Sequence, residues 1–189
     1  METYIYLVRH AESPYTEGNE RTRGLTTKGY SDLATVTEIL QSEEIDVIVS
    51  SPYTRAVLTV EPITKILGLE IKIFEDLREH HFCSEDYNLS DDDLSVSIER
   101  IISDQYFSLP GGESNKQLLA RSLPVFMKML DQFKGKRVVI GTHGIIMTAL
   151  MGYFDSQFDY KFFKQTTKPD IYKMTFREEQ LIQVVRLWR

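Results

Sequence analysis

Short apolar runs alternate with longer segments of helical periodicity along most of the chain. The runs predict strands at residues 4–8, 46–50, 70–74, 137–140, 171–176 and 181–187. Helical spacing of apolar residues predicts helices at residues 27–41 and 53–67, a long helix after residue 114, and a helix starting near residue 144. Strands that alternate with helices favour an α/β fold: a three-layer α/β/α sandwich with a mostly parallel sheet and an antiparallel edge formed by the last two strands.

Two segments lack this regularity. Residues 11–25 are polar and rich in turn-forming residues, which predicts a loop. Residues 80–110 are the least regular stretch, and a short helix is expected there over about residues 90–103. A chain of 189 residues fits one domain. We therefore expect a single domain over residues 1–189, with residues 80–110 inserted as a small helical lid.

Composition and charge narrow the partners. Hydrophobic residues make up 42% of the chain and charged residues 26%, which is ordinary for a globular protein. The net charge of −6 disfavours nucleic acid, because phosphate backbones attract basic surfaces. No apolar run approaches the roughly 18 residues that span a bilayer, so no membrane partner is expected. Cys83 has no second cysteine to pair with and no secretory leader is evident, which favours the cytoplasm.

Chemically reactive side chains follow four of the predicted strands. In chain order they are Arg9, His10, Arg55, Glu79 and His143. Because the carboxyl ends of parallel strands share one edge of a sheet, we expect these side chains to meet in one crevice. Guanidinium groups bind phosphate oxygens, a neutral imidazole is a nucleophile near pH 7, and a carboxyl group can protonate a departing alcohol. The set therefore favours phosphoryl transfer.

Six short motifs surround these residues in a fixed order. They are LVRHAES at 7–13, GLTTKG at 24–29, SSPYTRAVLT at 50–59, LRE at 77–79, PGGES at 110–114 and GTHG at 141–144. Together they resemble the motif series of the histidine phosphatase superfamily, also called the phosphoglycerate mutase-like family. The resemblance extends from residue 5 to about residue 150.

The resemblance implies a role for each matching residue. His10 is the expected nucleophile, which takes up the phosphoryl group as phosphohistidine. Arg9, Arg55 and His143 are expected to hold the phosphate and stabilise its charge. Glu79 is expected to protonate the leaving oxygen and then to activate water. No metal and no cofactor are implied, because cationic side chains fill the place of a metal ion.

Departures from the family motifs bear on the activity. Ala11 stands where many members have glycine, and Pro14-Tyr15 stands where glycolytic mutases have a Trp-Asn pair. We therefore expect a metal-independent phosphomonoesterase of the histidine acid phosphatase type, acting on a small phosphorylated substrate. A cofactor-dependent phosphoglycerate mutase and a non-catalytic, phospho-ligand-binding regulator on the same fold are the alternatives. The sequence leaves the identity of the substrate open.

Other side chains near the motifs have two interpretations. Some could contact the substrate or be solvated: Asn19, Arg21, Arg23 and His81. A zinc site is a weaker hypothesis, because the adjacent arginines repel a cation; its ligands would be His10, Glu79, His80 and His143. An aromatic cluster follows the fourth motif-bearing strand and predicts core packing or a homodimer interface: Tyr153, Phe154, Phe158, Phe162 and Phe163.

Overall fold

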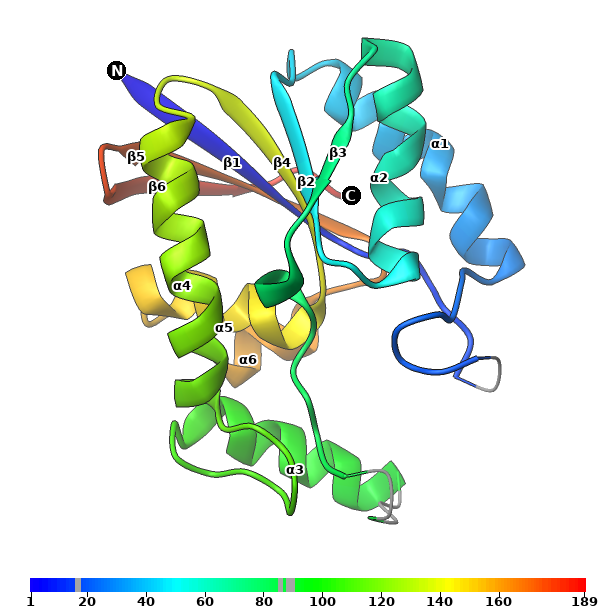
Figure 1. Ribbon diagram of the computed structural model, residues 1–189, viewed down its shortest axis with the longest axis vertical. Coiled ribbons are helices and arrows are strands. Elements are labelled where there is room, and N and C mark those ends of the chain that lie inside the picture. Colours follow the sequence, from blue (N-terminus) through cyan, green and yellow to red (C-terminus); the bar gives the residue numbers. More distant parts are fainter. Residues whose placement is uncertain (16–17, 85–86, 88–90) are drawn as a thin grey trace.

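A central sheet organises the molecule, and the computed structural model describes residues 1–15, 18–84, 87 and 91–189 (Figure 1). Within these residues the sheet has six strands: β1 (Glu2–Arg9), β2 (Val47–Ser50), β3 (Ile71–Ile73), β4 (Arg137–Thr142), β5 (Asp170–Arg177) and β6 (Gln180–Arg186). Their order across the sheet is β3-β2-β4-β1-β5-β6. Neighbours from β3 to β1 are parallel, whereas β5 runs antiparallel to both β1 and β6. The predicted antiparallel edge is therefore confirmed.

Helices cover both faces of the sheet. The helices are α1 (Thr27–Gln41), α2 (Thr54–Leu67), α3 (Asp91–Ser103), α4 (Asn115–Gln132), α5 (Gly144–Phe154) and α6 (Tyr160–Gln165). α1 and α2 pack on one face, and α4 and α5 pack on the other, where α3 and α6 also contact α5 (Figure 1). This is the expected three-layer arrangement. Among the described helices, none combines the length and the apolar character that crossing a membrane requires.

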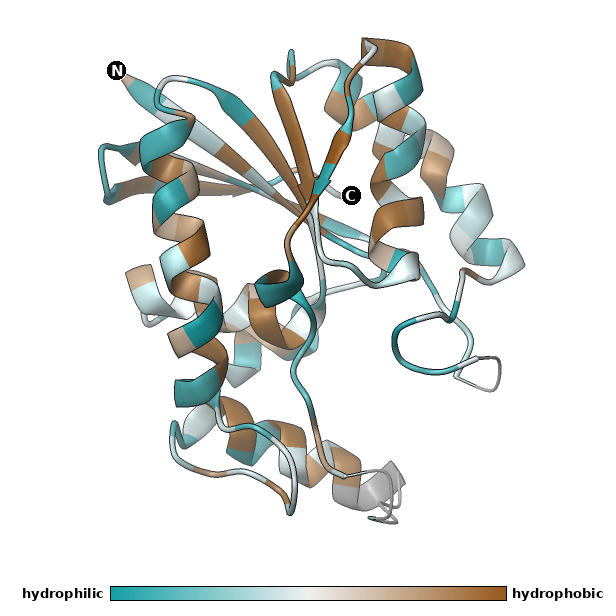
Figure 2. Cartoon of the chain, viewed as in Figure 1, coloured by the Kyte–Doolittle hydropathy of each residue, from teal (hydrophilic) through white to brown (hydrophobic). Residues whose placement is uncertain are grey.

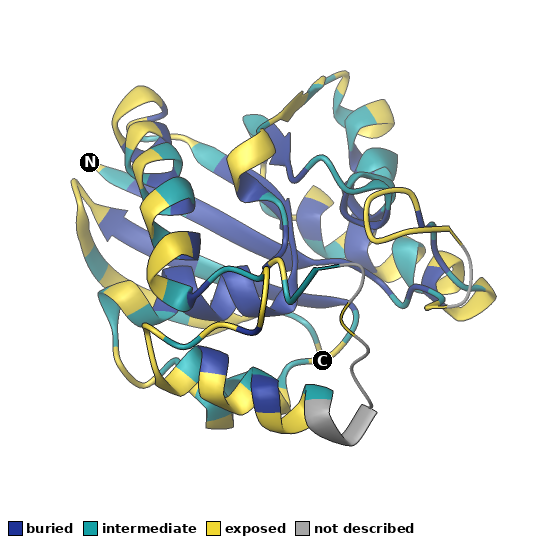
Figure 3. Ribbon diagram, turned by 60° about the horizontal axis from the view of Figure 1, so that its bottom comes forward, coloured by how far each residue is buried: buried dark blue, intermediate teal, exposed yellow. Residues whose placement is uncertain are grey.

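The buried strands supply side chains to two cores. In β1, Ile5 and Leu7 pack towards α4 and α5, whereas Tyr6 and Val8 pack towards α1 and α2. Successive side chains of a strand point to opposite faces, so a strand covered on both sides must be apolar throughout. Figure 2 shows this as continuous hydrophobic stretches in the central strands, and Figure 3 shows the same strands as the most buried part of the molecule. These runs are the pattern that predicted the sheet.

Local signals set where the helices begin and end. The Ser114 hydroxyl accepts a hydrogen bond from the Gln117 N–H, and the Gln117 side chain accepts one from the Ser114 N–H. This capping box satisfies N–H groups that have no partner within the helix, and so starts α4. α2 ends at Leu67 and is capped by Gly68, whose φ of 67° is a left-handed conformation that glycine adopts without strain.

The structure differs from the sequence predictions at several boundaries. β1 extends to Arg9 and β4 extends to Thr142, one and two residues beyond the predicted ends, because these two residues pair with each other across the parallel strands. The sequence patterns did not predict α6 or the 3-10 turn at Glu75–Leu77, since elements this short carry little periodicity. α3 ends at Ser103 as predicted, while Ser90 lies outside the described residues.

Candidate active site

Arg9 and His10 lie where β1 reaches the edge of the sheet. Arg9 is the last residue of the strand and is paired with Thr142 of β4. The backbone N–H of His10 donates to the Thr142 carbonyl oxygen at 3.0 Å. The His10 Nδ1 atom lies 2.7 Å from the carbonyl oxygen of Ala11. Because a carbonyl oxygen only accepts hydrogen bonds, Nδ1 carries the proton and Nε2 keeps its lone pair.

His143 connects β4 to α5 and lies against His10. It is the N-cap residue of α5, is fully buried, and has its ring centroid 5.3 Å from that of His10. Its Nε2 atom lies 2.6 Å from the hydroxyl of Ser51, which directly follows β2. The ends of three adjacent strands thus contribute to one cluster, at the edge of the sheet that the sequence predicted.

Both histidines are held in the neutral state at pH 7. Burial lowers the pKa of His10 well below its usual value, and the positive charges of Arg55 and Arg9 act in the same direction. Burial also lowers the pKa of His143 well below its usual value, with Arg55 and His10 adding to the effect. A neutral imidazole with a free ring nitrogen is a competent nucleophile.

Two buried guanidinium groups face one carboxylate beside these histidines. Arg55, in the first turn of α2, is 1% exposed and donates both to the backbone carbonyl of Glu20 and, at 3.0 Å, to its carboxylate. Arg23 donates to the same carboxylate through Nε at 3.0 Å and to the Ser13 hydroxyl at 2.8 Å. The loop after β1 and the start of α2 therefore bring two fixed positive charges together.

Glu79 follows the 3-10 turn and lies over the N-terminus of α5. Its Oε2 accepts from the Ile145 N–H at 3.1 Å, and its Oε1 accepts from the Ile146 N–H at 3.1 Å. The His80 N–H donates to Oε1 at 2.8 Å. The first N–H groups of a helix have no intrahelical partner, so they are free to bond the oxygens of a side chain there. The carboxyl group of Glu79 is therefore held in one orientation by three backbone donors.

The Arg9 guanidinium is positioned by residues that come after β4. Its Nη1 atom donates to the Thr166 hydroxyl, and its Cζ atom lies 5.4 Å from the centroid of the Phe163 ring. A Cβ atom at Gly144 would lie 2.8 Å from Nη2 of Arg9. The start of α5 and the α6–β5 loop therefore fix this side chain together.

These groups surround a cavity of about 290 Å³. Its polar lining residues are Arg9, His10, Tyr15, Glu20, Arg23, Arg55, Glu79 and Lys168. Its apolar lining residues are Phe82, Leu94, Ile98, Ile145 and Phe163. His143 is not part of the lining, and its Nδ1 atom is buried with no hydrogen-bond partner among the described residues. Chemically, the cavity can hold an anion beside His10 and an apolar or mixed group next to it.

The structure brings the expected site residues together, but only some of the secondary candidates. Arg23 lines the cavity, whereas Asn19, Arg21 and His81 do not. The Asn19 side chain accepts hydrogen bonds from backbone N–H groups of its own loop, and Arg21 forms a surface ion pair with Glu75 at 2.7 Å. His81 is exposed. Substrate contacts by these three residues are therefore not supported by the geometry.

Several lining residues were not predicted. Glu20, Tyr15 and Lys168 reach the cavity from loops, and Leu94 and Ile98 reach it from α3. None of them belongs to one of the six motifs. The helical periodicity of residues 91–103 is the one signal that could have indicated an apolar wall. The remaining contacts depend on loop paths that the spacing of residues does not determine.

The geometry gives no support to the zinc hypothesis. In the part of the chain that the structure describes, no group of three or more His, Cys, Asp or Glu side chains is arranged to hold a metal ion. His80, one of the suggested ligands, does not line the cavity that His10 and Glu79 line. The cavity instead places arginines around His10, which favours an anion over a cation.

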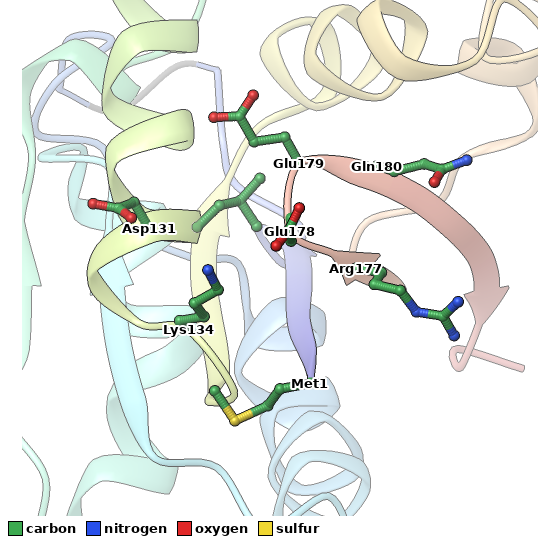
Figure 4. Close-up of a pocket in the computed structure, with 8 residues that line it drawn as sticks. Met1, Asp131, Lys134, Arg177, Glu178, Glu179 and Gln180 are labelled. Carbon is green, nitrogen blue, oxygen red and sulfur yellow. The ribbon is translucent and has the colours of Figure 1, made fainter.

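A larger cavity, of about 760 Å³, lies at the opposite end of β1 (Figure 4). Met1, Lys134 and the β5–β6 turn border it, and side chains of both charges line it. None of its lining residues belongs to the motif series. Size alone therefore does not identify the functional site, and the chemistry of the lining decides in favour of the smaller cavity.

Comparison with known proteins gives a family match over most of the chain. The family model of the histidine phosphatase superfamily (branch 1) matches residues 5–187. A protein named probable phosphoglycerate mutase GpmB, from Photorhabdus laumondii subsp. laumondii, is 31% identical over 159 residues, which is 78% of this chain and 73% of that protein.

Two solved structures share the fold. The mycobacterial glucosyl-3-phosphoglycerate phosphatase superposes with a TM-score of 0.77 at 18% identity, covering 98% of this chain and 97% of that one. The phosphoserine phosphatase of Entamoeba histolytica, in complex with 3-phosphoglyceric acid, superposes with a TM-score of 0.76 at 18% identity, covering 95% and 94%. At these identities they establish the fold alone. Since the family match spans nearly all of the chain, this protein belongs to the histidine phosphatase superfamily, branch 1.

Proposed function

We propose that the protein is a metal-independent phosphomonoester hydrolase that works through a phosphohistidine on His10. The observation that carries this proposal is the hydrogen bond from His10 Nδ1 to the Ala11 carbonyl oxygen, which leaves Nε2 unprotonated. Burial and the neighbouring arginines keep the pKa of this imidazole low, so the nucleophilic form dominates at neutral pH. Membership of the superfamily supports a phosphatase or a mutase.

The first step transfers the phosphoryl group to His10. The lone pair of Nε2 attacks phosphorus in line with the ester bond, which breaks with its electrons on the leaving oxygen. Glu79, which also lines the cavity, donates a proton to that oxygen, so that an alcohol departs rather than an alkoxide. Arg9 and Arg55 hold the phosphoryl oxygens and stabilise the charge that spreads over them in the transition state.

The second step returns the enzyme to its starting state. Water attacks the phosphorus of phosphohistidine and gives a proton to the Glu79 carboxylate. The P–N bond breaks, the electron pair returns to Nε2, and inorganic phosphate is released. His143 stabilises the charge of the phosphoryl group in both steps. Its ring lies against His10, and its buried Nδ1 has no partner among the described residues, so this nitrogen is available to a phosphoryl oxygen.

A phosphoglycerate mutase is the second candidate, and the GpmB relative favours it. A mutase uses the same phosphohistidine but returns the phosphoryl group to a second hydroxyl of the substrate instead of to water. The two activities are separated by incubation with 3-phosphoglycerate and catalytic bisphosphoglycerate. Release of inorganic phosphate in excess of 2-phosphoglycerate supports the hydrolase, and the reverse ratio supports the mutase.

The central experiment traps the phosphohistidine. Wild-type protein is incubated with a phosphomonoester that carries a labelled phosphoryl group and is quenched in alkali, where phosphohistidine survives. We expect label on the wild-type protein and none on His10→Ala, with turnover reduced by at least about 10³-fold. Circular dichroism and denaturant unfolding verify that the variant is folded. Turnover by a folded His10→Ala variant contradicts the proposal.

A further inference from the structure

Glu20 places a carboxylate in the part of the cavity where a phosphoryl group is expected. Its Oε2 atom accepts from Arg55 Nη2 at 3.0 Å and from Arg23 Nη2 at 3.2 Å, and its Oε1 atom accepts from Arg23 Nε at 3.0 Å. Its backbone carbonyl accepts a further bond from Arg55. The Glu20 carboxylate thus occupies hydrogen-bond donors of both buried guanidinium groups.

The Glu20 carboxylate differs from its partners in accessibility. The Arg55 and Arg23 side chains are 1% and 7% exposed, whereas the Glu20 side chain is 58% exposed. The loop around Glu20 is held by the Asn19 side chain, which accepts from the N–H groups of Arg21 and Thr22. Because these bonds do not involve the carboxylate, it can turn towards solvent while the loop keeps its shape.

A carboxylate and a phosphoryl group need the same donors. The planar guanidinium fork matches two oxygens of either anion, so the two compete for Arg55 and Arg23. Two anions a few ångströms apart also repel each other, most strongly where little water screens them. A phosphoryl group bound to these donors would therefore take the place of the Glu20 carboxylate.

We propose that Glu20 is a resident anion of the phosphate site, an inference that rests on the proposed function. In the free enzyme it neutralises Arg55 and Arg23, and it gives way when the phosphoryl group of the substrate binds. It returns to the two arginines as inorganic phosphate leaves. Glu20 thus lowers the affinity of the site for phosphate. By competing for Arg55 and Arg23, it also helps inorganic phosphate, the product, to dissociate.

A purely structural role for Glu20 predicts the opposite sign. If the carboxylate served only to orient Arg55, neutralising it would loosen that side chain and weaken the binding of phosphate. If it competes with phosphate, neutralising it strengthens binding. The direction of the change in phosphate affinity therefore separates the two roles.

Calorimetric titration with inorganic phosphate measures this direction. We compare the wild type with Glu20→Gln, which keeps the size of the side chain and removes the charge, and with Glu20→Ala. We expect both variants to bind phosphate about tenfold more tightly, and competitive product inhibition by phosphate to strengthen by a similar factor. Glu75→Gln is the matched control, because it removes a carboxylate from an arginine ion pair outside the cavity.

Each outcome has a defined meaning. Unchanged or weaker phosphate binding in folded Glu20→Gln and Glu20→Ala overturns the inference while leaving the proposed hydrolase intact. A gain of the same size in Glu75→Gln also overturns it, since the effect would then be one of overall charge. Absence of phosphate binding in the wild type and in every variant overturns both proposals. Denaturant unfolding of each variant verifies that affinities are compared between folded proteins.

Discussion

At the scale of single residues, Gly144 leaves the space that the Arg9 guanidinium occupies. The residue begins α5, and a Cβ atom there would lie 2.8 Å from Nη2 of Arg9 and 2.9 Å from the ring of Phe163. These distances are too short for ordinary contact, so Arg9 or Phe163 would have to move. The glycine of the GTHG motif is therefore needed for space.

We expect Gly144→Ala to lower kcat/KM by about 100-fold, because a displacement of about 1 Å in a group that holds the reacting phosphate has an effect of this order. Steady-state hydrolysis of p-nitrophenyl phosphate measures it. Gly24→Ala is the matched control, since a Cβ atom there has no neighbour closer than 3.9 Å. Equal activity of Gly144→Ala and the wild type would show that Arg9 tolerates the displacement or does not hold the phosphate.

At the scale of elements, the α6–β5 loop depends on a buried ion pair at its end. Asp170, the first residue of β5, is fully buried and accepts from Arg186 of β6 at 2.8 and 2.9 Å. It also accepts from the Thr167 N–H at 2.9 Å. This loop carries Thr166 to Arg9 and Lys168 to the cavity. The C-terminal hairpin, although distant in sequence from the motifs, thereby supports the site.

Replacing Arg186 by leucine should lower the free energy of unfolding by about 2–3 kcal/mol, because the substitution leaves a buried carboxylate without its charged partner. The Arg186 side chain is 39% exposed, so the effect lies below that of a fully buried pair. Urea unfolding monitored by circular dichroism measures it. Lys65→Leu breaks the exposed pair with Glu61 and should change stability by less than about 0.5 kcal/mol. Similar losses in both variants would refute a special role for the Asp170 pair.

At the scale of the whole molecule, three buried histidines link stability to pH. Burial lowers the pKa of His10, His80 and His143 below the usual value, in His80 against the opposing charges of Glu79 and Glu113. In the unfolded chain these groups titrate near pH 6.5. Between that value and the lower folded pKa values, the unfolded chain binds more protons than the folded one. The contribution is therefore complete above about pH 6.5 and is lost as the pH falls.

We expect the free energy of unfolding to fall as the pH is lowered from about 7 to 5, with each histidine contributing up to about 1.4 kcal/mol per pH unit. Guanidinium chloride unfolding at several pH values measures the slope. His80→Gln should reduce it by one histidine's share. A slope that is the same in His80→Gln and in the wild type would contradict the assignment.

Residue patterns along the chain predicted the sheet, its flanking helices and the principal residues of the candidate site. Apolar periodicity is a local property, and it predicted β1, β2, β4 and the long helices close to their observed bounds. Parallel topology then implied that Arg9, His10 and His143 meet at one edge, because all of them lie at the carboxyl ends of strands of the same sheet. Their proposed chemical roles are still predictions that kinetics must test.

The surroundings of those residues depend on how distant segments of the chain pack together. Glu20, Thr166 and Lys168 come to the site from loops whose paths depend on contacts between distant segments, and such contacts leave no periodic trace in the sequence. The proton on Nδ1 of His10, the helix-capping position of Glu79 and the space left by Gly144 are likewise geometric properties. Residue type and spacing indicate which chemistry is available, whereas distances of a few ångströms decide which groups take part.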